Sequence, residues 1–171
     1  MRSPGYRPAA AGQVTGCWFD EPLPGDQGSW AVPCGHGIYR DLDLELLDPA
    51  DEDERNFLIE AQHPEFTRAL RNDEEMIVNG EPFSPRLHVT LHQIVASQVL
   101  AGDPPETWRT VQRLASLGYD WHNVMHMIAD VINDDLHQML TEQRPFDSDG
   151  YAGRLRLLPG DWPPPEELGL R

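Results

Sequence analysis

Two short segments of this chain share a pattern, and each carries two histidines four residues apart. The first pair is His88 and His92, and the second pair is His122 and His126. Residues four positions apart lie one above the other on the same face of an α-helix, so each pair can direct two imidazoles toward one point. Because imidazole is the commonest side-chain ligand for metals, the repeated spacing predicts a metal site.

A third segment has chemistry of the same kind. Glu60 and His63 have the Glu-x-x-His spacing with which helical di-metal proteins direct a carboxylate and an imidazole inward together. We expect Glu60 to complete the ligand set or to act as a catalytic acid or base. The predicted metal ligands are His63, His88, His92, His122 and His126.

The ligand type narrows the choice of metal. Imidazoles suit zinc, iron, nickel or copper better than magnesium or calcium, so we expect zinc or iron, with copper as an alternative. Four imidazoles around one zinc would form a structural site, whereas three ligands and a water would leave a catalytic position open. The chain has no His-Glu-x-x-His motif, which argues against a zincin protease, and no Gly-rich phosphate loop.

Capping and breaking residues predict the helices that would position these side chains. Asp48, Ser84, Asp103 and Asp120 are expected N-caps, and Glu106 is placed for a capping box with Asp103. The expected helices cover residues 49–62, 64–70, 85–101, 104–117 and 121–144. Asn79-Gly80 predicts a tight turn, and Gly102 is expected to close the helix that begins at Pro85.

Short connections favour antiparallel neighbours. The helices that begin at Pro85 and Trp121 are separated by one helix, so we expect them to run parallel, with both histidine pairs at the same end. An antiparallel first helix would bring Glu60 and His63 to that end as well.

The expected fold class is all-α, a small helical bundle between two irregular arms. Residues 1–40 form a Gly- and Pro-rich N-terminal arm, residues 41–144 the helical bundle, and residues 145–171 a Pro-rich C-terminal arm. Cys17 and Cys34 are expected to be unrelated thiols in a reducing cytosol, with a disulfide or a zinc clip that includes His36 as alternatives.

Charge and hydropathy restrict the partners. The 171-residue chain has 29 acidic and 13 basic residues, a formal net charge of −16. This charge argues against nucleic acid and anionic membranes, and it is compatible with cations or a basic protein partner. No segment is long and apolar enough to span a bilayer, and the N-terminus lacks the apolar region of a signal peptide, so a cytoplasmic location is expected.

The histidine segments also carry a broader pattern. It resembles a bacterial family of domains of unknown function whose members contain PRLH-x-x-x-H, then DPPE, then G-Y-D-x-H-x-x-x-H. The likeness extends over roughly residues 40–142, and it implies a small helical domain without an established activity. The matching residues are Pro85-Arg86-Leu87-His88, His92, Asp103-Pro104-Pro105-Glu106-Thr107-Trp108, Gly118-Tyr119-Asp120, His122 and His126, preceded by His63-Pro64-Glu65-Phe66.

Two functions are consistent with these observations. The first is a transition-metal protein, expected to be a hydrolytic or redox enzyme that acts on a small molecule. The alternative is a non-enzymatic acidic protein, similar to an antitoxin or an immunity protein, whose histidines interlock the helices by hydrogen bonds. That alternative expects exposed aromatic residues in the arms, at Trp18, Trp30 or Trp162. Both functions are compatible with a homo-oligomer.

Overall fold

The computed structural model describes residues 18–169 and is mostly helical. Cys17 lies outside the described residues, so the expectation about its relation to Cys34 is not addressed. None of the helices in the described part is both long and apolar enough to cross a membrane. The α-helices are α1 (Gln27–Ala31), α2 (Glu52–Ala61), α3 (Thr67–Asn72), α4 (Pro85–Ala101), α5 (Pro105–Ser116), α6 (Trp121–Glu142) and α7 (Ser148–Leu157).

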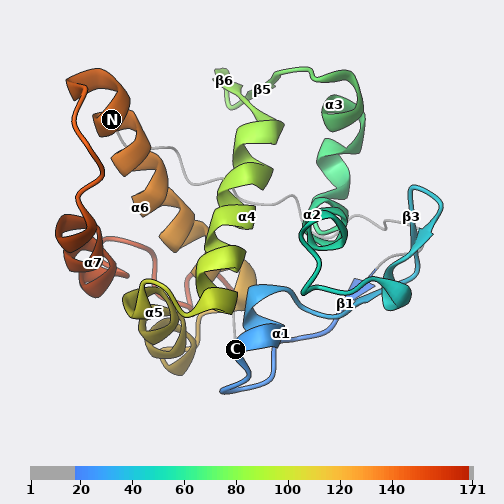
Figure 1. Cartoon of the computed structure of the whole chain (residues 1–171), viewed down its shortest axis with the longest axis horizontal. Coiled ribbons are helices and arrows are strands. Elements are labelled where there is room, and N and C mark those ends of the chain that lie inside the picture. Colours follow the sequence, from blue (N-terminus) through green and yellow to red (C-terminus); the bar gives the residue numbers. More distant parts are fainter. Residues whose placement is uncertain (1–17, 170–171) are drawn as a thin grey trace.

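The strands form three small antiparallel ribbons between and beside the helices (Figure 1). The turn of the third ribbon is Asn79-Gly80, where both residues have positive φ, as the sequence predicted for a turn. The ribbons are β1 (Trp18–Phe19) with β2 (Gly35–His36), β3 (Ile38–Tyr39) with β4 (Leu42–Asp43), and β5 (Met76–Val78) with β6 (Glu81–Phe83). Two 3-10 turns, η1 (Leu44–Leu46) and η2 (Pro64–Phe66), complete the elements.

Helix α4 is the central element, in contact with α1, α2, α3, α5 and α6. Its predicted ends are confirmed: the Ser84 side chain accepts a hydrogen bond from the Leu87 amide, and Gly102 closes the helix with a left-handed φ of 64°. Val95 and Val99 are fully buried along its length. A helix with neighbours on several sides is held rigidly, which suits it to position a site.

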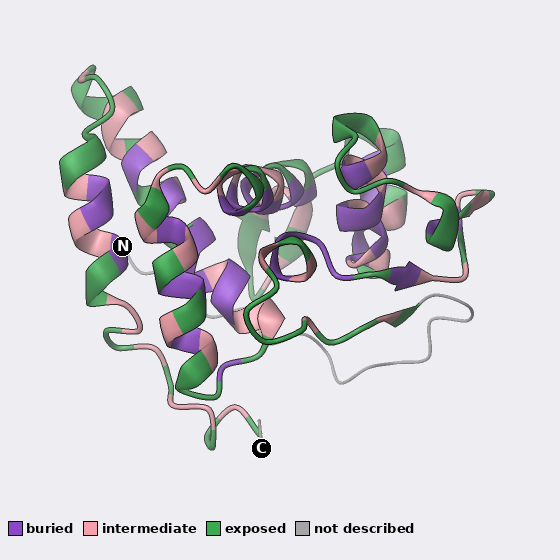
Figure 2. Ribbon diagram, turned by 60° about the horizontal axis from the view of Figure 1, so that its bottom comes forward, coloured by how far each residue is buried: buried purple, intermediate pink, exposed green. Residues whose placement is uncertain are grey.

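Helix α6 begins where the sequence predicted, because Asp120 accepts a hydrogen bond from the Asn123 amide at 2.8 Å. Its apolar residues at helical spacing are buried against α4, α5 and α7, as Figure 2 shows by the purple stripes on the helix faces that look inward. The buried residues include Val124, Ile128, Val131 and Ile132.

The expected parallel arrangement of α4 and α6 is wrong. His126 lies beside His88, with ring centroids 5.0 Å apart, and Trp121 at the start of α6 lies beside His92, at 6.0 Å. This order of contacts belongs to helices that run in opposite senses, which Figure 1 also shows. The inference failed because α5, seen nearly end-on in that view, crosses its neighbours instead of lying antiparallel to both.

Two predicted caps also differ from the structure. Helix α2 begins later than expected, because Asp51 accepts the hydrogen bond from the Glu54 amide while Asp48 caps the preceding turn at Ala50. Helix α5 has Pro104 at its N-cap position without a side-chain cap. Glu106 pairs with arginines of α5 and α7 instead of completing a capping box.

The C-terminal segment is more ordered than an irregular arm. Within residues 145–171, α7 begins after its cap Asp147 and buries Tyr151 and Leu155 against α5 and α6. The sequence expectation gave too much weight to the prolines at 163–165, which follow this helix. The signals for α7 were the Asp147 cap and the two apolar residues four positions apart.

The N-terminal segment packs on the helices through α1. Trp30 is buried, and its carbonyl accepts a hydrogen bond from Trp121 Nε1 at 2.8 Å. Gln27 donates from its side chain to the Val99 carbonyl near the end of α4. This segment therefore holds the start of α6 and the end of α4 together.

A buried ion pair between α6 and α7 leads to a stability prediction. The Asp135 side chain is 4% exposed and accepts a hydrogen bond from Arg154, which is 31% exposed. Arg154→Met would leave a buried carboxylate without its cation and should cost about 3 kcal/mol in the free energy of unfolding. Asp135→Asn should cost less, about 1 kcal/mol, because the guanidinium can turn toward water.

Urea unfolding at neutral pH measures both changes. Arg156→Met is the matched control, because Arg156 pairs with Glu106 at the surface and should change the unfolding free energy by well under 1 kcal/mol. An Arg154→Met protein as stable as the control would contradict the role given to this pair.

Candidate metal centre

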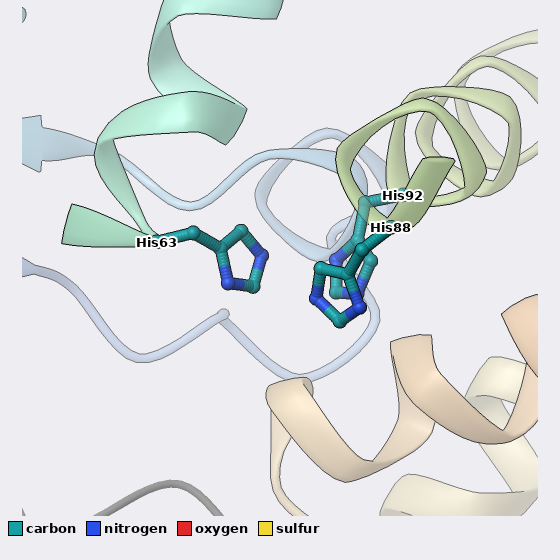
Figure 3. A group of neighbouring side chains, drawn as sticks. All are labelled: His63, His88 and His92. Carbon is teal, nitrogen blue, oxygen red and sulfur yellow. The ribbon is translucent and has the colours of Figure 1, made fainter. Parts of the chain in front are cut away.

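Three separate segments bring five histidines together. His63 follows the end of α2 and opens η2, His88 and His92 lie in the first two turns of α4, and His122 and His126 lie in the first two turns of α6. Figure 3 shows the His63 ring pointing toward the His88 and His92 rings. All the metal ligands predicted from sequence therefore meet in one place, although α4 and α6 run in opposite senses.

The ring distances describe a compact cluster. His63 lies 4.7 Å from both His88 and His92, measured between ring centroids, and His88 and His92 are also 4.7 Å apart. From α6, His126 lies 4.9 Å from His92. His122 is 4.0 Å from His126 and 5.7 Å from His63.

These distances are close to those of a metal site. With a zinc–nitrogen bond of about 2.0–2.1 Å, two imidazoles in a tetrahedral shell have ring centroids about 5 Å apart. One nitrogen each of His63, His88 and His92 can be chosen so that all three lie within 4.8 Å of one another. Nitrogens bound to one zinc in a tetrahedral shell lie about 3.3 Å apart, so these side chains would have to move closer together to bind a single ion. His122 and His126 are not part of this group of three.

The imidazole nitrogens are buried and lack hydrogen-bond partners within residues 18–169. This holds for both ring nitrogens of His92, and for Nε2 of His63, His88, His122 and His126. A buried polar atom without a partner costs about 1–3 kcal/mol. Six such atoms together would cost a large part of the stability of an ordinary domain, about 5–15 kcal/mol, so a partner from outside the chain, such as a metal ion or a water, would stabilise this cluster.

The protonation state of four of these histidines is also compatible with metal binding. Burial, together with the smaller effect of nearby histidines, lowers the pKa of His88 to about 3 and that of His122 to about 4. Burial also lowers the pKa of His92 and His126 well below the ordinary value. The imidazoles of these four residues are therefore neutral at physiological pH, the form that binds metals.

Aromatic side chains enclose the cluster. Phe66 stacks on His63, with ring centroids 5.6 Å apart and planes inclined by 17°. Phe83 lies 5.6 Å from His88, and Trp121 lies 6.0 Å from His92. This apolar wall strengthens electrostatic interactions inside the site. It also explains why desolvation is the largest influence on the histidine pKa values.

The predicted catalytic residue Glu60 does not contact the cluster through its carboxylate. Its Oε2 lies 2.8 Å from Arg40 Nη1, and both side chains are about one-fifth exposed. Glu60 still positions the site through its backbone, because its carbonyl accepts a hydrogen bond from the His63 amide. Its role as an acid or base stays a prediction from spacing.

The carboxylate that lies beside the histidines is Glu65, which the sequence argument did not select. Its Oε1 is 3.5 Å from His63 Nδ1, and its side chain is 38% exposed. Burial raises the pKa of Glu65, but the His63 contact and a backbone hydrogen bond outweigh burial and lower it. The sequence signal was the His63-Pro64-Glu65 segment, in which a carboxylate follows the histidine by two residues.

Two surface hollows lie away from the histidine cluster. One, of about 390 Å³, has a lining that includes Asp73, Arg86 and Thr90, and another, of about 370 Å³, is lined by Asp53, Asn56, Phe57 and Glu60. Neither is lined by a histidine of the cluster. Among the aromatic residues that the partner-binding alternative expected to be exposed, Trp18 is exposed, Trp30 is buried and Trp162 is intermediate.

Comparison with known proteins places most of this structure in one family. The family model described as "Domain of unknown function (DUF1841)" matches residues 43–157, which include all five clustered histidines and the whole of α7. The chain matches no curated protein and no solved structure.

The buried histidines lead to a prediction for the metal-free protein. Their folded pKa values lie below the unfolded value of 6.5, so between those values the unfolded chain binds more protons than the folded chain. The free energy of unfolding should therefore fall as pH drops from 7 to 5, by about 2 kcal/mol for each histidine that stays neutral when folded.

Urea titrations of chelator-treated protein at several pH values measure this slope. A His88→Gln/His122→Gln protein should show a shallower slope, whereas His137→Gln should match the wild type because His137 is exposed on α6. A wild-type stability that does not change between pH 7 and pH 5 would contradict the neutral, buried state of the imidazoles.

Proposed function

The chain belongs to the DUF1841 family, and because the description of that family names no activity, we propose a function from the site itself: the protein binds a transition-metal ion. The ligands are drawn from His63, His88, His92, His122 and His126. The observation that carries this proposal is the convergence of five imidazoles, each with at least one buried ring nitrogen that has no hydrogen-bond partner within the described residues.

The set of donors supports zinc or iron, with copper as the alternative. Five imidazoles and one nearby carboxylate make a nitrogen-rich site, which these metals prefer over oxygen-rich sites. Magnesium and calcium would need several oxygen ligands, whereas the carboxylate that contacts the clustered rings is that of Glu65, which fits these metals poorly. The net charge of −16 also favours accumulation of cations around the protein.

The proposal extends to metal-dependent catalysis, either hydrolytic or redox, on a small molecule. A bound metal would supply Lewis acidity for water activation, or redox chemistry if it is iron or copper. Among the chain's own groups, Glu65 lies beside the site and its side chain reaches solvent, so it could relay protons between the site and solvent. Its lowered pKa keeps it ionised and makes it a weak base. His63 and His92 are the most buried histidines and would hold the ion from the inner side.

The alternative function is a non-enzymatic, acidic protein that binds a basic protein partner. The exposed Trp18 and the acidic composition favour it. In this alternative the histidines should form hydrogen bonds between helices. The histidine nitrogens that have no partner within the described residues argue against that role. A metal-free protein that captures a basic partner, with no change when the clustered histidines are replaced, would favour this alternative.

Metal content tests the main proposal. Protein purified without a histidine tag should contain stoichiometric zinc, iron or copper by elemental analysis. His92→Ala/His126→Ala should lose that metal, because it removes one ligand from each of α4 and α6, and circular dichroism should show that the helices persist. His137→Ala is the matched control on α6 and should keep the metal. Metal at the wild-type level in the double variant would contradict the proposal.

Cobalt substitution separates a catalytic centre from a structural one. A centre with an open position should change its visible cobalt spectrum when azide is added, because azide binds directly to the ion. A spectrum that azide leaves unchanged would indicate a closed shell, and the catalytic part of the proposal would then be wrong while metal binding stands.

Metal should also stabilise the fold, because the site joins α4, α6 and the turn after α2. At a free zinc concentration about one thousand times the dissociation constant, the free energy of unfolding should rise by about 4.1 kcal/mol. Thermal unfolding of stripped protein, with and without zinc, measures the effect. An equal shift in His92→Ala/His126→Ala would show that zinc acts elsewhere on the chain.

A further inference from the structure

A second group of metal-ligating side chains lies on the ribbon of β1 and β2, away from the elements that carry the five histidines. The group consists of Asp20, Cys34 and His36, and one ligand atom from each can be chosen so that all three lie within 4.8 Å of one another. Cys34 is exposed and forms no disulfide within the described residues. Nothing in the function proposed above uses these residues.

Strand pairing explains why the three side chains meet. Trp18 pairs with His36, and Phe19 pairs with Gly35, in antiparallel register. The pairing continues by one residue, because the Asp20 amide donates a hydrogen bond to the Cys34 carbonyl at 2.9 Å. Side chains alternate between the two faces of a ribbon, so Asp20, Cys34 and His36 share one face.

Close packing on the other face keeps the strands in this register. A Cβ atom at Gly35 would lie 2.7 Å from Phe19 Cε1 and 3.2 Å from the Leu44 Cβ. Only glycine permits this approach of the Phe19 ring and η1 to the ribbon. Gly35 therefore helps to hold Cys34 and His36, its two chain neighbours, opposite β1.

The His36 ring is held in one orientation. It stacks on Trp18, with centroids 5.3 Å apart and planes inclined by 15°. Its Nδ1 lies 3.3 Å from Glu45 Oε1, and its Nε2 lies 3.0 Å from Asp20 Oδ2. A carboxylate on one imidazole nitrogen is the usual arrangement when the other nitrogen binds a metal, because it fixes the tautomer and the ring direction.

We propose that Asp20, Cys34 and His36 bind a second divalent transition-metal ion, with zinc as the best match. A thiolate sulfur, an imidazole nitrogen and a carboxylate oxygen are the three protein ligand types that zinc prefers, and a water would complete a tetrahedral shell. Glu45 orients the imidazole and adds negative charge beside the ion. The ion would fasten β1 to β2, and so fix the N-terminal segment next to η1.

A simpler account is an ion pair of His36 with two carboxylates at the surface. That account explains the positions of Asp20 and Glu45, but it gives Cys34 no part. The thiolate therefore distinguishes the two accounts, and it also distinguishes this site from the histidine centre, which contains no sulfur ligand.

Cobalt(II) is the probe for the test, added to reduced, full-length protein that has been stripped of metal. A thiolate bound to cobalt gives an intense near-ultraviolet charge-transfer band, which imidazole ligands do not give. Wild-type protein should show this band. Cys34→Ser and His36→Gln should abolish or strongly weaken it, while both keep the visible bands of the histidine centre.

The reciprocal variant separates the two sites. His92→Ala/His126→Ala should keep the charge-transfer band and lose the visible bands of the histidine centre. No charge-transfer band in the wild type would overturn the second site, whatever the histidine centre does. A band that persists in Cys34→Ser would also overturn it, because the sulfur ligand would then be Cys17, the other cysteine of the chain.

Discussion

The structure depends most on one constraint: imidazole nitrogens are buried where α4, α6 and the turn after α2 meet. Burying polar atoms is costly unless they are paired, and a shared cation would satisfy several convergent nitrogens at once. The surrounding elements keep these nitrogens buried. Phe66, Phe83 and Trp121 cover the rings, and the hydrogen bond from Trp121 to the Trp30 carbonyl fixes the start of α6.

The outer segments hold the geometry of the two helices that carry histidine pairs. Helix α1 connects the end of α4 to the start of α6, through Gln27 and Trp30. Helices α5 and α7 also bind α4, because Gln98 of α4 accepts hydrogen bonds from Thr107 of α5, at 2.8 Å, and from Tyr151 of α7, at 2.7 Å. The site is thus supported by parts of the chain that lie outside the histidine motifs, and α7 lies within the segment that defines the family.

Much of the local structure could be predicted, because short-range rules determine it. The caps Ser84 and Asp120, the closing Gly102 and the Asn79-Gly80 turn act within a few residues, and the structure has them as expected. The convergence of the two His-x-x-x-His pairs with His63 was also correct. The helix directions were wrong, because crossing angles are set by side-chain packing between elements, which spacing does not encode. Likewise Glu60 has the expected spacing, but Arg40, which is distant in sequence, binds its carboxylate.

The central claim is that the cluster of His63, His88, His92, His122 and His126 binds a transition-metal ion. Anomalous diffraction from crystals of the protein grown with zinc, recorded on both sides of the zinc absorption edge, tests it most directly. The account predicts an anomalous peak within this cluster, at bonding distance from ring nitrogens of at least three of its histidines. Imidazoles hydrogen bonded to one another or to water, with no peak between them, would contradict it.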